Sequence, residues 1–233
     1  MSHPPGSAER LNDLWAQRDA ATPFAYVHGR LVTWGQLWSA VRWLAERLPD
    51  RRYVFNLCQD RLRFCVLLLA SLWRGQISLL PPSGAHRVLE ELLREYPDAY
   101  LAAEQAGDDR LAPWFSVPPG LPHAPSPPVS LPEADPAAIL FTSGSSGRYK
   151  TCTHTLATFA ASARQAVSSL GLASAERMLI CTAPPQHMFG LETSIFWPLF
   201  STLVVAAGRP FFPETIRNTL RAAPLPGLLV STP

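Results

Sequence analysis

The chain has 233 residues, which is enough for one large domain or two small ones and for a sizeable hydrophobic core. Hydrophobic residues make up 47% of the sequence and charged residues 16%, and this composition excludes a wholly disordered chain. The net charge of +2 lacks the basic excess of a protein that neutralises many phosphates, so nucleic acid is not an expected partner.

The cysteines and the apolar stretches favour a reduced protein of the cytoplasm. None of the four cysteines belongs to a CxxC pair: Cys58, Cys65, Cys152 and Cys181. We therefore expect free thiols and no metal site. Residues 1–14 carry charges where a signal peptide needs an apolar stretch. The uncharged apolar stretches at 64–73 and 195–207 are shorter than the roughly 20 residues that span a bilayer, so no membrane span is expected.

The first half of the chain alternates helices and strands. Thr33 and Gln36 have the spacing of a capping box, and an amphipathic helix follows until Pro49. The elements expected next are a strand over 53–57, a helix over 62–73 capped by Asp60 and stopped by Gly75, a strand over 77–80, a helix over 87–96 and a strand over 99–102. This alternation predicts an α/β fold of mostly parallel sheets covered by helices.

A proline-rich stretch divides the sequence. Residues 118–136 contain eight prolines in 19 residues, so an extended connection is expected between a lobe over 1–117 and a lobe over 137–233. The elements expected after it are strands over 137–142 and 150–154, a helix over 156–170 and strands over 177–182, 202–206 and 227–231. The chain ends directly after the last strand, which leads us to expect that the natural protein continues.

The strongest chemical signal is the segment 139–150, with the sequence ILFTSGSSGRYK. An apolar strand enters a loop of glycines and hydroxyls that ends in Lys150, the only lysine among the 20 basic residues of an arginine-rich sequence. Glycines let the backbone approach an anion, hydroxyls and N–H groups donate to phosphate oxygens, and an ammonium offsets their charge. A solvated Ser/Gly turn is the alternative that this composition alone would favour. The strand and the solitary lysine favour a polyphosphate-binding loop, exposed and mobile when empty over residues 143–150.

The spacing of this loop excludes the common phosphate motifs. The P-loop, the G-x-G-x-x-G dinucleotide pattern and the G-x-S-x-G hydrolase elbow do not match it. Residues 142–150 instead resemble the signature of the adenylate-forming (AMP-binding) superfamily, which runs Thr-Ser-Gly-Ser/Thr-Thr/Ser-Gly, two residues, then Lys. Tyr149 stands where the family usually has proline, so the loop tip is expected to differ in shape.

A second segment supports the same resemblance. Residues 183–191, APPQHMFGL, are similar to the family's Pro-x-x-His-x-x-Gly-Leu segment, whose histidine borders the carboxylate and the adenylate. Residues 31–37 and the pair Asp60-Arg61 also resemble family segments, so the resemblance covers most of the chain, as the N-terminal part of the family's large domain. Without it, His187 would be a hydrogen-bonded histidine at a strand end, Asp60 a helix cap, and Arg61 a surface or lobe-bridging charge.

The resemblance implies an acid–thiol ligase of the acyl-CoA synthetase type. Such an enzyme joins a carboxylic acid to the α-phosphate of ATP, with Mg²⁺, and passes the acyl group to coenzyme A or to the phosphopantetheine of an acyl carrier protein. Carried over residue by residue, it places the ATP phosphates at Thr142, Ser143, Gly144, Ser145, Ser146, Gly147 and Lys150. It places the acid beside His187, where Phe189, Phe196 and Trp197 favour an aryl or fatty acid.

Other interpretations stay open at this point. Family members are much longer, and the segments that hold adenine and ribose and carry the C-terminal catalytic lysine would lie beyond Pro233, so the isolated chain is expected to be inactive. The main alternative is a non-catalytic nucleotide- or anion-binding module or a degenerate fragment. A third is a hydrolase-like α/β fold with an accidental loop.

Overall fold

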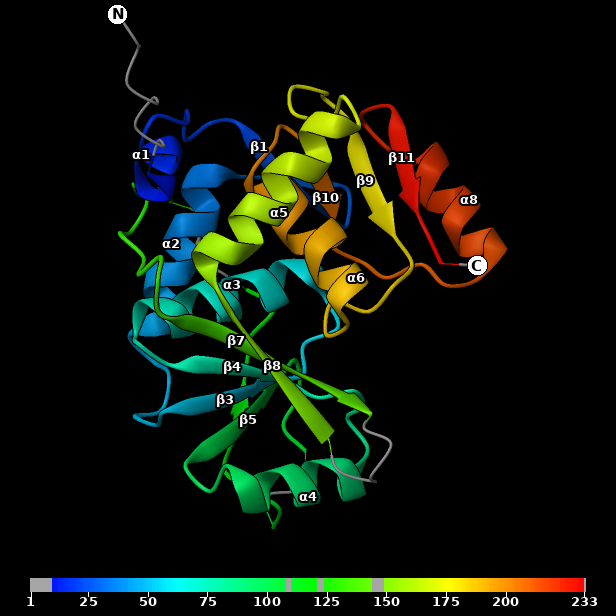
Figure 1. The fold of residues 1–233 in the computed structure, drawn as a ribbon. Helices are drawn as coiled ribbons and strands as arrows, with labels where there is room; N and C mark the ends of the chain where they lie inside the picture. Colours follow the sequence, from blue (N-terminus) through cyan, green and yellow to red (C-terminus); the bar gives the residue numbers. More distant parts are fainter. Residues whose placement is uncertain (1–9, 108–109, 121–123, 144–148, 233) are drawn as a thin grey trace, which may run out of the picture.

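Two β-sheets with a layer of helices between them make up the fold (Figure 1). The computed structural model describes residues 10–107, 110–120, 124–143 and 149–232. Neighbouring strands are parallel in both sheets except for one antiparallel pair at an edge of each. The predicted α/β fold of mostly parallel sheets covered by helices is therefore confirmed.

The six-stranded sheet has the strand order β6-β5-β3-β4-β7-β8. Its strands are β3 (Tyr53–Asn56), β4 (Ile77–Leu80), β5 (Ala99–Ala103), β6 (Trp114–Ser116), β7 (Pro136–Ser143) and β8 (Tyr149–Thr155). Helix α3 (Arg61–Trp73) joins β3 to β4 across one face, and α4 (His86–Glu95) joins β4 to β5 across the other. The chain therefore leaves the carboxyl ends of the neighbouring strands β3 and β4 toward opposite faces of the sheet. A crevice forms between these two ends, and open α/β sheets bind ligands at such a crevice.

The five-stranded sheet has the strand order β11-β9-β10-β1-β2. Its strands are β1 (Pro23–Val27), β2 (Arg30–Thr33), β9 (Met178–Cys181), β10 (Val204–Ala206) and β11 (Gly227–Val230). Each sheet thus contains strands from before and after the proline-rich stretch 118–136. The boundary between 1–117 and 137–233 is not the boundary between the sheets.

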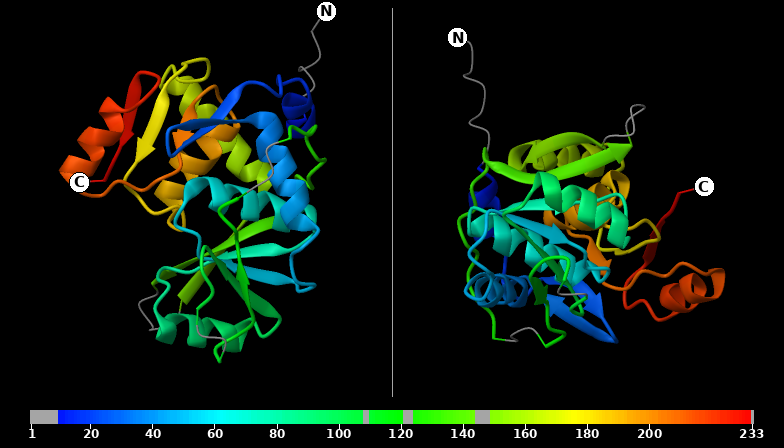
Figure 2. Two further views of the ribbon diagram at one scale, coloured as in Figure 1. Left: turned by 180° about the vertical axis from the view of Figure 1, so that it is seen from behind. Right: turned by 90° about the horizontal axis from the view of Figure 1, so that it is seen from below.

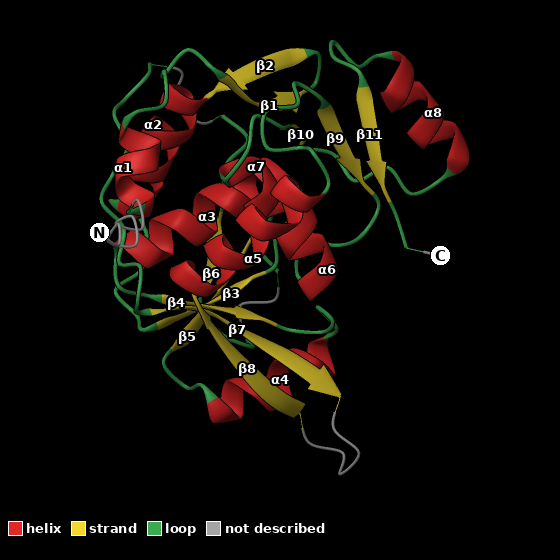
Figure 3. Ribbon diagram, turned by 45° about the horizontal axis from the view of Figure 1, so that its top comes forward, coloured by secondary structure: helices red, strands yellow, loops and turns green. Residues whose placement is uncertain are grey.

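Helix α3 lies between the two sheets and explains the large core that they share. Almost all of its side chains are buried, and they share one hydrophobic cluster with residues of both sheets. A helix that is apolar on every side is stable only when it is surrounded. Figure 3 shows α3 in the helical layer with the two sheets on either side. No helix in the described part of the chain is long and apolar enough to cross a bilayer.

The remaining helices cover the sheets. They are α1 (Leu11–Ala16), α2 (Trp34–Ala45), α5 (Leu156–Ser169), α6 (Met188–Leu191), the π-helical turn η1 (Glu192–Phe196), α7 (Trp197–Leu199) and α8 (Pro213–Arg221). The capping box of α2 is confirmed, because Gln36 N donates to Thr33 Oγ1 and Thr33 N to Gln36 Oε1. Helix α8 has no buried residue and lies with β11 at the edge of the molecule (Figure 2).

Candidate active site

The antiparallel pair β7–β8 carries the ends of the predicted phosphate loop. Gly144, Ser145, Ser146 and Gly147 lie outside the described residues, so the predicted conformation and mobility of the loop stay untested. Its flanks differ from the prediction: Ser143 is the last residue of β7 and Lys150 the second of β8, so both belong to paired strands rather than to a loop. The strand pairing places Thr142 opposite Lys150.

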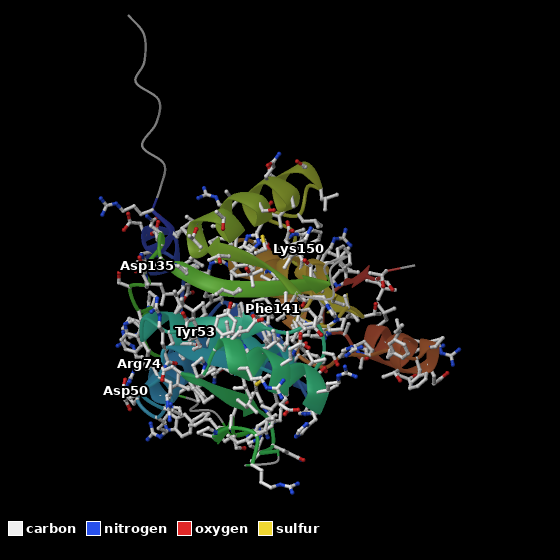
Figure 4. The ribbon with its side chains drawn as sticks, turned by 60° about the horizontal axis from the view of Figure 1, so that its bottom comes forward. Asp50, Tyr53, Arg74, Asp135, Phe141 and Lys150 are labelled. Atoms are coloured by element: carbon white, nitrogen blue, oxygen red, sulfur yellow. The ribbon has the colours of Figure 1, made fainter. Side chains whose placement is uncertain are left out.

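Thr142 and Lys150 share the sheet face that α3 and α5 cover. Side chains alternate between the two faces along a strand. Phe141 points to the opposite face, where its ring contacts those of Tyr96 and Tyr149 at centroid distances of 5.7 and 6.5 Å. Figure 4 shows Lys150 and Phe141 on opposite sides of the β7–β8 pair. Both Thr142 and Lys150 are exposed, so a hydroxyl and an ammonium are accessible at the carboxyl end of β7.

His187 is positioned by the helical segment that follows it. The residue is the exposed N-cap of α6, and α6, η1 and α7 continue without a break, so it lies at a helix start rather than at a strand end. Thr193 Oγ1 donates to the Phe189 carbonyl at 2.7 Å and Ser194 Oγ to the Gly190 carbonyl at 2.6 Å, which stabilises the wide turn. Single π-helical turns of this kind occur frequently at functional sites.

Two contacts fix the loop that precedes His187. Gly190 lies so close to Pro184 that a Cβ at this position would be 2.0 Å from the Pro184 carbonyl oxygen. On the other side, Gln186 Nε2 donates to the Cys58 carbonyl at 2.5 Å. Residues 183–187 are therefore held between their own helix and the segment that follows β3.

Arg61 joins the loops of the two sheets. Its side chain is completely buried, and its guanidinium donates to the carbonyl oxygens of Gly208 at 2.6 Å and Ala183 at 2.8 Å, and also to that of Cys181. Burial lowers the pKa of Arg61, and carbonyl oxygens replace part of the lost hydration. The interpretation of Arg61 as a surface charge is wrong, whereas its bridging role is confirmed.

Two cavities meet at His187. One, of about 310 Å³, lies at the carboxyl ends of β3 and β4, and its lining includes Leu57, Gln59, Pro81 and Ser83. The other, of about 450 Å³, lies at the carboxyl ends of β9 and β11, and its lining includes Thr182, Phe189, Phe211, Ile216 and Ser231. Pro184, His187 and Arg209 border both cavities. The candidate site therefore lies at the edge where both sheets end their parallel strands, and where β7 also ends (Figure 1).

Arg209 is the main residue that the sequence analysis missed. Its Nε donates to the Thr182 carbonyl and its Nη1 to Gln59 Oε1, both at 3.3 Å. Arg209 follows a buried strand directly, in the segment AAGRPFF, and this position could have identified it as a candidate site residue. Thr182 and Ser231 contact each other through their hydroxyls at 2.9 Å on the wall of the larger cavity.

Two carboxylates near the site accept backbone N–H groups at the start of α3. Asp60 accepts from Arg63 N at 2.9 Å as the predicted helix cap, and burial raises the pKa of its carboxyl. Glu104 Oε1 accepts from the backbone N–H groups of Gln59 and Asp60 at 2.6 and 2.7 Å. Among the described residues, no group of three or more His, Cys, Asp or Glu side chains could hold a metal ion.

Another cavity lies away from His187. It measures about 520 Å³, is mostly apolar, and is lined by Val27, Leu31, Leu37 and Leu62 between the β1–β2 hairpin and α2. None of the predicted site residues borders it. Its size therefore gives no reason to move the candidate site away from His187.

Comparison with known proteins decides the family. A family model described as "AMP-binding enzyme" matches residues 52–222, which is well over half of the chain. The chain belongs to the AMP-binding enzyme family. Both motifs, 142–150 and 183–191, lie within the matched region, and the predicted family resemblance is confirmed. A search of curated proteins finds no match.

Solved structures show the same fold in longer chains. The o-succinylbenzoate coenzyme A synthetase from Bacillus subtilis, in complex with ATP and magnesium ion, gives a TM-score of 0.73 at 17% identity over 92% of this chain and 61% of that chain. Apo MatB from Rhodopseudomonas palustris gives 0.72 at 19% identity over 91% and 48%. A malonyl-CoA ligase with methylmalonyl-CoA and AMP bound gives 0.69 at 21% identity over 89% and 45%. This member of the AMP-binding family therefore spans less than two thirds of the length of these structures.

Proposed function

We propose that this chain contributes to an ATP-dependent acid–thiol ligase, which activates a carboxylic acid as an acyl adenylate and transfers the acyl group to a thiol. The observation that carries the proposal is the meeting of two cavities at His187, at the edge where β7 delivers the ends of the phosphate loop. The segments 142–150 and 183–191, which resemble the family's nucleotide-binding and acid-binding motifs, therefore meet the same edge of the fold.

The exposed groups at the end of β7 fit a nucleotide polyphosphate. The Thr142 hydroxyl can donate to a phosphate oxygen, and the Lys150 ammonium on the same sheet face can offset its charge. We expect the residues over 143–147 to complete this binding site. Mg²⁺ commonly binds through nucleotide phosphates with few protein ligands, so it would arrive with ATP and neutralise the charge of the pyrophosphate. A related structure was crystallised with ATP and magnesium ion.

The chain's own residues have the task of holding two anions together. A carboxylate oxygen of the acid attacks the α-phosphorus of ATP, the bond to the β-phosphate oxygen breaks, and pyrophosphate leaves. Lys150 and the N–H donors of the loop offset the charge on the leaving group, and His187 orients the attacking carboxylate. The acceptor thiol, of coenzyme A or of a carrier phosphopantetheine, then displaces AMP from the acyl carbon.

The larger cavity favours an acid with an apolar body, either aryl or fatty. Phe189, Phe211 and Ile216 supply its apolar wall. The expectation for Phe196 was wrong, because that ring is completely buried and stacks on Phe159 at a centroid distance of 4.1 Å. The apolar contacts therefore come from residues 189, 211 and 216 rather than from the interior of the helix.

Hydroxamate trapping of the acyl adenylate tests the proposal. A panel of aryl and fatty acids is incubated with MgATP and the 233-residue chain, alone and then with a polypeptide that supplies the rest of the fold seen in the longer structures. We expect acid-dependent product only in the second case, since a misplacement of about 1 Å can cost roughly a hundredfold in rate. Robust turnover by the chain alone would contradict its expected inactivity. MgATP binding without acid-dependent product in either case would favour a nucleotide-binding module instead.

A further inference from the structure

Arg209 is a cation at the candidate site that forms no ion pair with a carboxylate of the described residues. Its side chain is exposed, and it donates to a backbone carbonyl and to an amide oxygen, both at 3.3 Å. The centroid of the Phe211 ring lies 6.0 Å from its guanidinium carbon. Among the ion pairs of the described residues, Arg209 takes part in none. A guanidinium carries five N–H donors, so two long hydrogen bonds leave most of its capacity available.

The charged groups around Arg209 have other hydrogen-bond partners. Its guanidinium repels that of Arg61, and this repulsion contributes to the lowered pKa of Arg61. The nearby carboxylates of Asp60 and Glu104 accept backbone N–H groups at the start of α3 instead. Among the described residues none of these groups forms a hydrogen bond or ion pair with Arg209, so its guanidinium is available to an anionic ligand at the point where the two cavities meet.

The larger cavity combines this cation with an apolar wall. Arg209 and His187 both border it, and Phe189, Phe211 and Ile216 lie along the same cavity. A fatty acid with one carboxylate could contact His187 and the apolar wall, but the Arg209 guanidinium would then have no anionic partner. An acid with a second anionic group would satisfy all three features at once.

We infer that Arg209 binds a second carboxylate of the acid, so that the preferred substrate is a dicarboxylic acid with an apolar aryl or alkyl body. This inference rests on the proposed function, because it assigns the reacting carboxylate to the side of His187. The planar guanidinium suits a carboxylate because two parallel N–H groups can donate to its two oxygens. A nucleotide phosphate is the other anion that Arg209 could bind, and the experiment includes it.

Calorimetric titration of the 233-residue chain, without ATP, tests the assignment. Terephthalate and 4-methylbenzoate form a matched pair, because they differ only by a carboxylate in place of a methyl group. We expect terephthalate to bind about fivefold more tightly, the upper range for an ion pair that is partly open to solvent. AMP and pyrophosphate are titrated in parallel. Circular dichroism and thermal unfolding verify that each variant is folded.

Three variants separate a binding role from a general effect of charge. Arg209→Gln is expected to bind terephthalate and 4-methylbenzoate equally, and Arg209→Lys to keep part of the preference. Arg217→Gln removes the same charge from an exposed ion pair with Glu214 on α8, outside both cavities, and is expected to keep the full preference.

Equal binding of the two acids by the unmodified chain, or an unchanged preference in Arg209→Gln, would overturn the inference. Weaker binding of AMP or pyrophosphate by Arg209→Gln, with the preference for terephthalate retained, would assign Arg209 to the nucleotide and also overturn it. Because the titration contains no ATP, it does not depend on adenylate formation. A preference for terephthalate together with a failure to form adenylate even when the added polypeptide is present would reject the proposed function and leave the dicarboxylate site in place.

Discussion

Replacement of Gly190 by alanine should displace His187, because the helix and the preceding loop leave no room for a methyl group. The added Cβ would lie 2.0 Å from the Pro184 oxygen, 2.7 Å from the Pro184 carbonyl carbon and 3.1 Å from the Ala183 oxygen. Relief of the closest contact requires a shift of about 1 Å, since real Cβ atoms essentially never approach closer than 3.0 Å. The obstacle is backbone rather than a flexible side chain, so the loop or the helix must move.

The expected cost follows from this overlap. Overpacking of a tight site costs about 1–3 kcal/mol, and the better helix propensity of alanine returns up to about 1 kcal/mol. A net loss of about 1–2 kcal/mol would lower the melting temperature by about 2–8 °C for a chain of this size. Urea and thermal unfolding measure the loss, and the ring resonances of His187 report its displacement.

Gly208→Ala provides the matched control. Gly208 lies at the same edge of the fold, but a Cβ there would meet nothing within 4 Å. We expect this variant to unfold within about 0.5 kcal/mol of the unmodified chain. A Gly190→Ala chain that unfolds like the control, with the His187 resonances unchanged, would show that the close approach to Pro184 does not position the histidine.

Three further variants test individual side chains. Lys150→Ala is expected to weaken MgATP binding about tenfold in calorimetry and Lys150→Arg to restore only part of it, because a planar fork does not replace a compact ammonium; unchanged affinity in the alanine variant would remove Lys150 from the nucleotide site. His187→Ala is expected to weaken acid binding while the MgATP dissociation constant stays within about twofold; an equal loss of both would place His187 against the nucleotide. Burial raises the pKa of the Asp60 carboxyl, so the folded chain holds that proton more tightly than the unfolded chain, and stability falls as the pH rises between the two pKa values. Asp60→Asn keeps the cap without the charge, so the free energy of unfolding of this variant should rise relative to that of the unmodified chain from about pH 4 to pH 7. A difference in free energy of unfolding that is the same at every pH would show that the pKa of Asp60 does not change on folding.

Local hydrogen-bonding signals made parts of the fold predictable. The capping box at Thr33 and the cap at Asp60 involve partners three residues away, so the sequence contains the whole interaction. The strand over 77–80 matches β4 at both ends, because a glycine stop and two prolines bound its apolar run. These predictions succeeded because both partners, or both boundaries, lie within a few residues.

The missed elements lack such signals or depend on distant contacts. Strand β1 was missed, and the turn that follows it places His28 at a φ of +46°, a conformation that glycine or asparagine would have indicated more clearly. Helix α8 has no buried residue, and only Ile216 and Leu220 mark its helical spacing with large apolar side chains. The burial of Arg61 follows from carbonyl groups about 120 to 150 residues away, which no local pattern contains.

The candidate site shows the same division between local and distant interactions. The motif around His187 is continuous in sequence, yet its position depends on the first turn of α3. Arg61 N donates to the Ala207 carbonyl at 2.9 Å, and its side chain binds the carbonyl groups that precede His187 and Arg209. One buried arginine therefore fixes the loops after β9 and β10 relative to the crevice of the other sheet. This is why His187 and Arg209, which lie on separate segments, both border the two cavities, as the proposed binding of one acid by both residues requires.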